Sequence, residues 1–125
     1  MKHFDRSQRV ADEIRRIVAE ALQRVVKDFD FTRVTVTRCD VTRDLSEATV
    51  RYSVLGDDTH RREAADQLAR VVGFLQRHVG DELRLRQTPH LRFAFDDSVM
   101  ESLRLEELFD QIADERKDDD QSSSR

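Results

Sequence analysis

The spacing of apolar residues changes near residue 30, and this change constrains the fold more than any other feature of the chain. Between residues 6 and 26, apolar side chains recur three or four positions apart, which is the spacing of one helix face. The series consists of Val10, Ile14, Ile17, Val18, Ala21, Leu22 and Val25. We expect an amphipathic helix over 6–26, with Ser7 as its N-cap because a serine hydroxyl can accept from an unpaired N–H of the first turn.

Two strands are predicted after this helix, because apolar residues then alternate with polar ones. The first is expected over 31–41 and the second over 48–54, joined by the short polar link 43–46. So short a link predicts an antiparallel hairpin. Val41 falls on the opposite parity from the valines before it, which predicts a bend or a bulge near Cys39.

The second half of the chain begins with a turn and a helix cap over 56–59, and helical spacing of apolar residues follows as far as Leu83. Gly73 interrupts this spacing, and a glycine inside a helix costs about 1 kcal/mol relative to alanine. We therefore expect a kink that separates two helical halves, so that the second half has an N-terminus of its own. The apolar residues expected in that half are Phe74, Leu75, Val79 and Leu83.

A third strand and a last helix are predicted beyond Pro89. Leu91, Phe93 and Phe95 share one face of the strand, which favours core packing over base stacking. The segment Asp96-Asp97-Ser98 favours N-capping of a helix that ends near Ile112. The remaining residues, 113–125, are acidic and serine-rich, and we expect them to be disordered because they cannot bury apolar surface.

This order of elements predicts a single α+β domain over 1–112, with helices on one face of a three-stranded sheet. One cysteine excludes an internal disulfide and a multi-cysteine zinc site. No apolar run has the length of a membrane span, and the N-terminus has no hydrophobic stretch of the signal-peptide type. We therefore expect a soluble protein of the cytoplasm that has no membrane partner.

The charge balance argues against a simple, strongly basic nucleic-acid binder, since 22 basic residues face 26 acidic ones. Without 113–125 the balance is still 19 to 21. Only three of the basic residues are lysine, and the planar fork of arginine suits phosphates and base edges. A GC-rich genome would produce the same bias, so the arginine content alone does not decide the function.

No pattern for catalysis is present. The four histidines are scattered, without the spacing of metal ligands, and the three glycines stand too far apart for a phosphate-binding loop. Cys39 has no neighbouring base in the sequence and is expected to be a packed thiol. We expect no catalytic residue, no metal and no cofactor.

A phosphate-binding surface is the functional hypothesis that the residues themselves support. A helix N-terminus with arginines beside it can bind phosphate, and Gly73 would set the geometry of the helix pair. The candidate contacts are Arg43, Arg70, Gly73, Arg77, Arg84 and Arg86. An equally weighted alternative is that the arginines at positions 70–86 are ordinary solvated residues, compensated by Asp66, Asp81 and Glu82. Arg43 could instead form an ion pair in the hairpin with Asp44 or Glu47.

Several segments in this order resemble the bacterial ribosome-binding factor A family. They are Arg6–Ile14, Arg43–Val50, Gly73–Arg77, Leu83–Phe93 and Asp96–Ser98, and the resemblance spans about 6–112. It implies a type II KH-like fold with an interrupted helix pair. The family has an Ala-x-Gly kink where this chain reads Val71-Val72-Gly73, so the glycine matches and the alanine does not.

The resemblance also implies a function: a non-catalytic assembly factor that acts as a monomer. Such a factor binds the immature small (30S) ribosomal subunit and its 16S rRNA, together with small-subunit proteins. It assists late maturation near the 5′ end of the RNA and supports growth in the cold. The alternative from another class is a protein–protein adaptor that uses an exposed helix face and the acidic tail.

Overall fold

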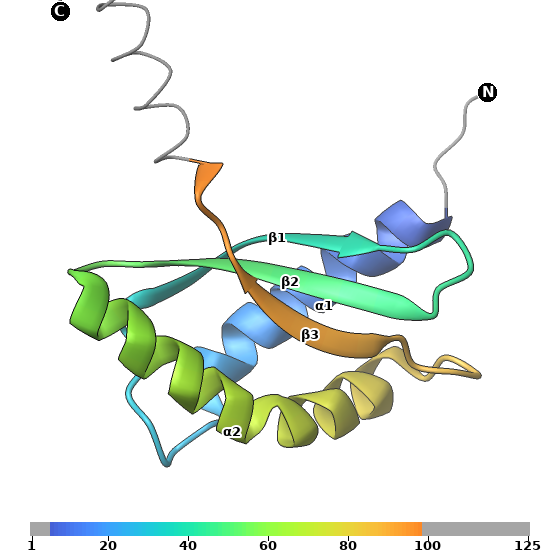
Figure 1. The fold of residues 1–125 in the computed structure, drawn as a ribbon. Coiled ribbons are helices and arrows are strands. Elements are labelled where there is room, and N and C mark those ends of the chain that lie inside the picture. The colour runs from blue at the N-terminus through green and yellow to red at the C-terminus, as the bar shows by residue number, and fades with distance from the viewer. Residues whose placement is uncertain (1–5, 99–125) are drawn as a thin grey trace, which may run out of the picture.

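Five elements make up the fold of residues 6–98, which are the residues that the computed structural model of the protein describes (Figure 1). In chain order they are α1 (Arg6–Arg24), β1 (Val34–Val41), β2 (Glu47–Val54), α2 (Asp58–Leu83) and β3 (His90–Phe95). The predicted last helix and acidic tail lie outside the described residues.

The strands form one mixed sheet in the order β1-β2-β3. β1 and β2 pair antiparallel, which confirms the predicted hairpin. β3 pairs parallel with β2, and a parallel neighbour needs a long crossover connection, which α2 provides. The register of β1 shifts between Val36 and Arg38, so both Val36 and Cys39 face the core. This shift is the irregularity that the change of parity predicted.

Both helices pack on one face of the sheet, as Figure 1 shows, and the predicted α+β architecture is confirmed. The core between the layers consists of alternate strand residues and one stripe of each helix. Its most completely buried side chains include Ile14, Val18, Phe31, Val50, Leu68, Leu75 and Val79. Phe93 and Phe95 pack against this core from β3, as their shared parity predicted.

The ends of α1 differ from the prediction. Ser7 lies inside the helix and is buried, so it is not the N-cap. The helix ends at Arg24, and Val25 just beyond it is 40% exposed instead of packed in the core. The side-chain amide of Gln23 donates to the carbonyl of Phe31, which ties the end of the helix to the chain that enters β1.

The expected division at Gly73 is wrong, because α2 is one continuous helix of 26 residues. Leu68 and Val71 before the glycine, and Leu75 and Val79 after it, are all buried in the same core. Burial of each such side chain is worth about 1.5–3 kcal/mol, which outweighs the cost of a glycine in the helix. The helix axis changes direction near its middle in Figure 1, so a bend is present without a break.

The start of α2 confirms the predicted cap. Asp57 is the N-cap: its carboxylate accepts from the backbone N–H of His60, and its own N–H donates to the His60 ring. The hydrogen bond from the His60 backbone lowers the pKa of Asp57. The backbone amides of His60 and Arg61 in the first turn of α2 are thus partnered by Asp57.

Candidate nucleic-acid interface

Three of the six predicted site residues lie on the side of α2 that faces away from the core. Arg70, Gly73 and Arg77 are exposed, and at 100° per residue they lie opposite the buried stripe. These three residues are called the outer face of α2 below. The separate helix N-terminus that was expected to bind phosphate beside them does not exist, because the backbone amides after Gly73 remain inside a continuous helix.

The arginines of this region do not pair with the carboxylates nearby. Asp66 and Asp81 stand four residues from Arg70 and Arg77, which is the usual spacing for helical ion pairs. Within residues 6–98, no ion pair or side-chain hydrogen bond involves Arg70, Arg77, Arg84 or Arg86. The alternative explanation was that nearby carboxylates compensate the charges of these arginines. Direct contacts within residues 6–98 do not provide such compensation.

The open face of the sheet contrasts with this helix. Arg51 donates to the carboxylate of Asp40 at 2.9 Å, and Arg38 lies 3.3 Å from the same carboxylate. Thr37 donates to Asp96 at 2.5 Å, and this bond is the main cause that lowers the pKa of Asp96 to about 2. Within residues 6–98, Arg70 and Arg77 of α2 have no ion-pair partner, whereas Arg38 and Arg51 on the sheet share the carboxylate of Asp40.

Arg84 and Arg86 lie in the segment that leads from α2 to β3. Arg84 is the C-cap residue, with a left-handed backbone (φ 55°), and its N–H donates to the carbonyl of Gly80. A Cβ at Gly80 would lie 2.9 Å from Thr88 Oγ1, so the segment folds tightly back on the helix. The side-chain amide of Gln76 bonds the carbonyl of Pro89 and the N–H of Leu91, each at 2.8 Å. The two arginines therefore project from a fixed loop.

Arg43 lies in the connection between β1 and β2, at the same end of the molecule. Figure 1 shows this connection beside the segment that enters β3, and the His90 N–H donates to the Ser46 carbonyl across the gap. Asp44 accepts from the Ser46 and Thr42 hydroxyls, which lowers its pKa and holds the turn. Arg43 is exposed on this turn and takes part in an interaction of its own.

A hollow beside Arg70 was not predicted. It has a volume of about 490 Å³ and lies between the chain after α1 and the middle of α2, with Lys27 and Phe74 among its lining residues. Phe74 was expected to be apolar core, yet it is 37% exposed and its ring stacks on His78 with centroids 5.8 Å apart. Phe74 lies about 100° around the helix from Leu75, on the side away from Val79, so it falls outside the buried stripe of α2. That angular difference is the signal that the sequence contained.

Catalytic and metal chemistry find little support in the described residues. No group of three or more His, Cys, Asp or Glu side chains within 6–98 is arranged to hold a metal ion. Burial raises the pKa of the Cys39 thiol to about 12, so it is not a ready nucleophile. No helix in the described part of the chain is long and apolar enough to cross a bilayer.

Replacing Gly73 with alanine is expected to stabilise the protein by about 0.5–1 kcal/mol. The residue is helical and exposed, and an added Cβ would meet only the Arg77 Nη1 atom, at 3.8 Å. The change therefore restricts the unfolded chain without a clash in the folded one. Chemical denaturation of Gly73→Ala and of the natural chain measures the difference, and a loss of stability would contradict this account of the helix.

Comparison with known proteins identifies the family. The model of the family described as ribosome-binding factor A matches residues 6–109. The chain belongs to the ribosome-binding factor A family. A ribosome-binding factor A of Geobacter sulfurreducens is 38% identical over 94% of this chain and 99% of that protein. One from Anaeromyxobacter sp. strain K is 45% identical over 86% of this chain and 79% of that protein.

Solved structures agree with this family assignment. A candidate ribosome-binding factor A of Thermotoga maritima, solved by NMR, superimposes with a TM-score of 0.65 at 30% identity, covering 75% of this chain and 90% of that one. The crystal structure of the Thermus thermophilus family member has a TM-score of 0.60 at 22% identity, over 70% and 93% of the two chains, and supports the fold. A homology model of the Thermus protein has also been fitted into a cryo-electron microscopy map of a 30S complex.

Proposed function

We propose that this protein is a non-catalytic assembly factor that binds the immature small ribosomal subunit in the cytoplasm. In this proposal it acts as a monomer and assists late maturation of 16S rRNA, including processing at the 5′ end, and it supports growth in the cold. Its membership of the ribosome-binding factor A family supports this function. The fit of the Thermus relative into a map of a 30S complex supports the small subunit as the partner.

One observation carries the assignment of the RNA-binding surface. The guanidinium groups of Arg70 and Arg77 have no carboxylate partner among the described residues, and they flank Gly73, which has no side chain of its own. Phosphate oxygens would supply the missing partners, and arginine binds them through two parallel hydrogen bonds. Arg84, Arg86 and Arg43 would extend the contact at the far end of α2.

The net negative charge of the chain does not oppose such binding. Charges are screened over about 8 Å at physiological ionic strength, so the potential near α2 depends on the groups close to it. On the sheet, by contrast, the carboxylates of Asp40 and Asp96 are engaged by neighbouring side chains. Each phosphate contact would release counterions, which makes the affinity fall as salt rises.

Sedimentation of a cell lysate through a sucrose gradient tests the proposal. The protein is expected to migrate with free small subunits and not with complete ribosomes. A variant that lacks 113–125 is expected to migrate in the same way, since the acidic tail repels RNA. Loss of subunit binding in this variant would favour the adaptor function, and migration of the natural chain at the top of the gradient would contradict the proposal.

A further inference from the structure

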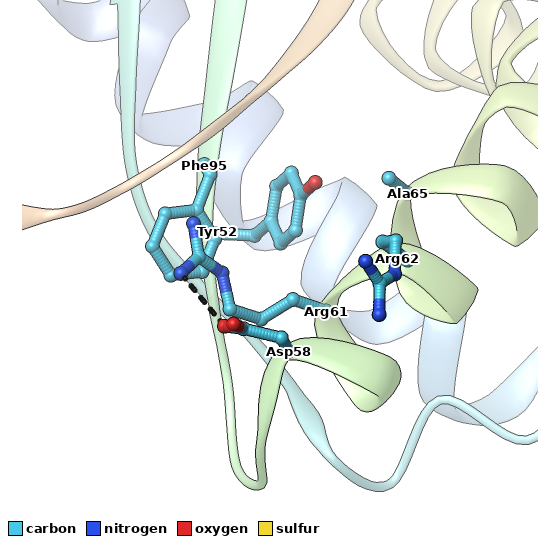
Figure 2. A pocket seen from close by; sticks show the side chains of 6 residues that line it. All are labelled: Tyr52, Asp58, Arg61, Arg62, Ala65 and Phe95. Atoms are coloured by element: carbon cyan, nitrogen blue, oxygen red, sulfur yellow. Dashed lines mark ion pairs between the residues drawn. The ribbon is translucent and has the colours of Figure 1, made fainter.

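A second hollow lies between the first turns of α2 and the end of β3, away from the arginines discussed above (Figure 2). Its volume is about 410 Å³, within the range of small-ligand sites in proteins. The residues that line it are Tyr52, Asp58, Arg61, Arg62, Ala65 and Phe95. Aromatic rings and two adjacent arginines thus meet in one open site.

The Arg61 guanidinium lies over an aromatic ring in this hollow. Its central carbon lies 3.9 Å from the centroid of Phe95, which is the geometry of a cation–π contact. Asp58 lies 3.6 Å from the same guanidinium and holds it from the side. The Arg61 side chain is still 43% exposed, so the guanidinium that lies over Phe95 remains accessible to a ligand.

Tyr52 contributes a nearly buried polar group. The residue is only 5% exposed, and its ring packs edge-on against Phe93 and Phe95. No hydrogen bond of its hydroxyl to another residue of 6–98 is present. Figure 2 shows the hydroxyl pointing into the hollow, toward the side of Ala65 and Arg62. The hydroxyl oxygen is not itself fully buried, so it is accessible from the hollow and is positioned to bond a ligand.

These groups together fit one class of ligand. A planar guanidinium with an open face is a stacking surface for a nucleobase, a second arginine suits a phosphate, and a hydroxyl can bond a polar edge. We propose that this hollow binds an unpaired nucleotide of RNA. The base stacks on Arg61 above Phe95, Arg62 contacts the phosphate, and the Tyr52 hydroxyl bonds the nucleotide.

The position of the hollow agrees with the RNA-binding surface proposed for α2, on which this inference rests. Arg62 precedes Gly73 by eleven residues, which is close to three helical turns, so the two positions lie on the same side of the helix. The distance along the axis is about 16 Å. A polynucleotide that follows the outer face of α2 toward its N-terminus would reach the hollow.

Substitution of Arg61 by lysine separates stacking from charge. The full chain is titrated against a fluorescent, unstructured single-stranded oligoribonucleotide of about ten nucleotides. Arg61→Lys keeps the positive charge and loses the planar stack, so we expect about tenfold weaker binding at every salt concentration and an unchanged salt slope. Tyr52→Phe, which keeps the ring, is expected to weaken binding by a few-fold. Arg16→Lys, on the exposed side of α1, is the matched control and is expected to change nothing.

An abasic oligonucleotide with the same phosphates provides the second arm of the test. Arg61→Lys should bind it as well as the natural chain does, because no base is present to stack. The inference would be overturned if Arg61→Lys and Tyr52→Phe both bound the normal oligoribonucleotide with the affinity of the natural chain. It would also be overturned if the natural chain did not bind this oligoribonucleotide. The sedimentation experiment is independent: absence of the protein from the small-subunit fraction would overturn the proposed function while a loss on Arg61→Lys still supported the nucleotide site.

Discussion

Reversing the charge at Arg70 and Arg77 together is expected to weaken binding to free small subunits by on the order of a hundredfold. Both side chains are exposed on the outer face of α2, and neither has a carboxylate partner within 6–98. Two phosphate contacts would be lost, and two negative charges would repel the RNA. The plot of log affinity against log salt should become less steep by about two, one for each contact removed. Titration of purified subunits at several salt concentrations measures both quantities.

The chain contains a closely matched control for this experiment. Arg9 and Arg16 are also seven residues apart on an exposed helical surface, in α1. The double variant Arg9→Glu/Arg16→Glu changes the net charge by the same amount without touching α2. It is expected to keep most of the affinity and the full salt slope. Equal losses in the two double variants would mean that overall charge, and not the α2 surface, governs binding.

Truncation of Leu75 to alanine is expected to cost about 3–4 kcal/mol of folding free energy. Leu75 is fully buried at 0% exposure, in the stripe of α2 that packs on the core. Removing its side chain leaves a cavity that a close-packed interior cannot fill. For a domain of this size, such a loss of stability lowers the melting temperature by more than about 10 °C. Calorimetry or thermal unfolding followed by circular dichroism measures it.

The residue next to Leu75 tests whether the loss of stability depends on burial. Phe74→Ala removes a larger group, but one on the partly exposed side of α2, stacked on His78. It is expected to cost about 1 kcal/mol or less. If Phe74→Ala proved as damaging as Leu75→Ala, the orientation of α2 on the sheet would have to differ from the one described.

The order of the elements could be predicted because apolar spacing reports directly which side of a helix or strand is buried. Val34 and Val36 in β1, and Val50 and Tyr52 in β2, face the core as the alternation predicted. The parallel placement of β3 was not predicted. Strand direction depends on how α2 crosses the sheet, and no residue in Leu91–Phe95 encodes that path locally.

The error at Gly73 has a different origin. The intrinsic cost of glycine predicted a kink that separates two helical halves, but the energy that keeps the helix continuous comes from Leu68, Val71, Leu75 and Val79 packing in the core. Tertiary packing commonly overrides local propensity in this way. The candidate arginines were found from their type and clustering, and their RNA contacts stay a prediction.

The hollow at Arg61 could not be predicted from the sequence, for a related reason. Tyr52 and Phe95 come from strands, whereas Arg61 comes from α2, and only the register between β2 and β3 brings the two rings together. Phe95 was correctly predicted to pack on the core. That its other role is to support a guanidinium depends on contacts across more than thirty positions of the chain.

The parallel neighbour of β2 has a consequence for synthesis of the protein. During translation the hairpin is complete before α2 exists, and the 26 residues of that helix take about one to five seconds to add. Throughout this interval one edge of β2 has unpaired backbone groups, beside the apolar residues Ala48, Val50 and Tyr52. Such an edge can pair with another nascent chain. The unpaired edge of β2 is therefore a site at which nascent chains can associate until β3 has paired with it.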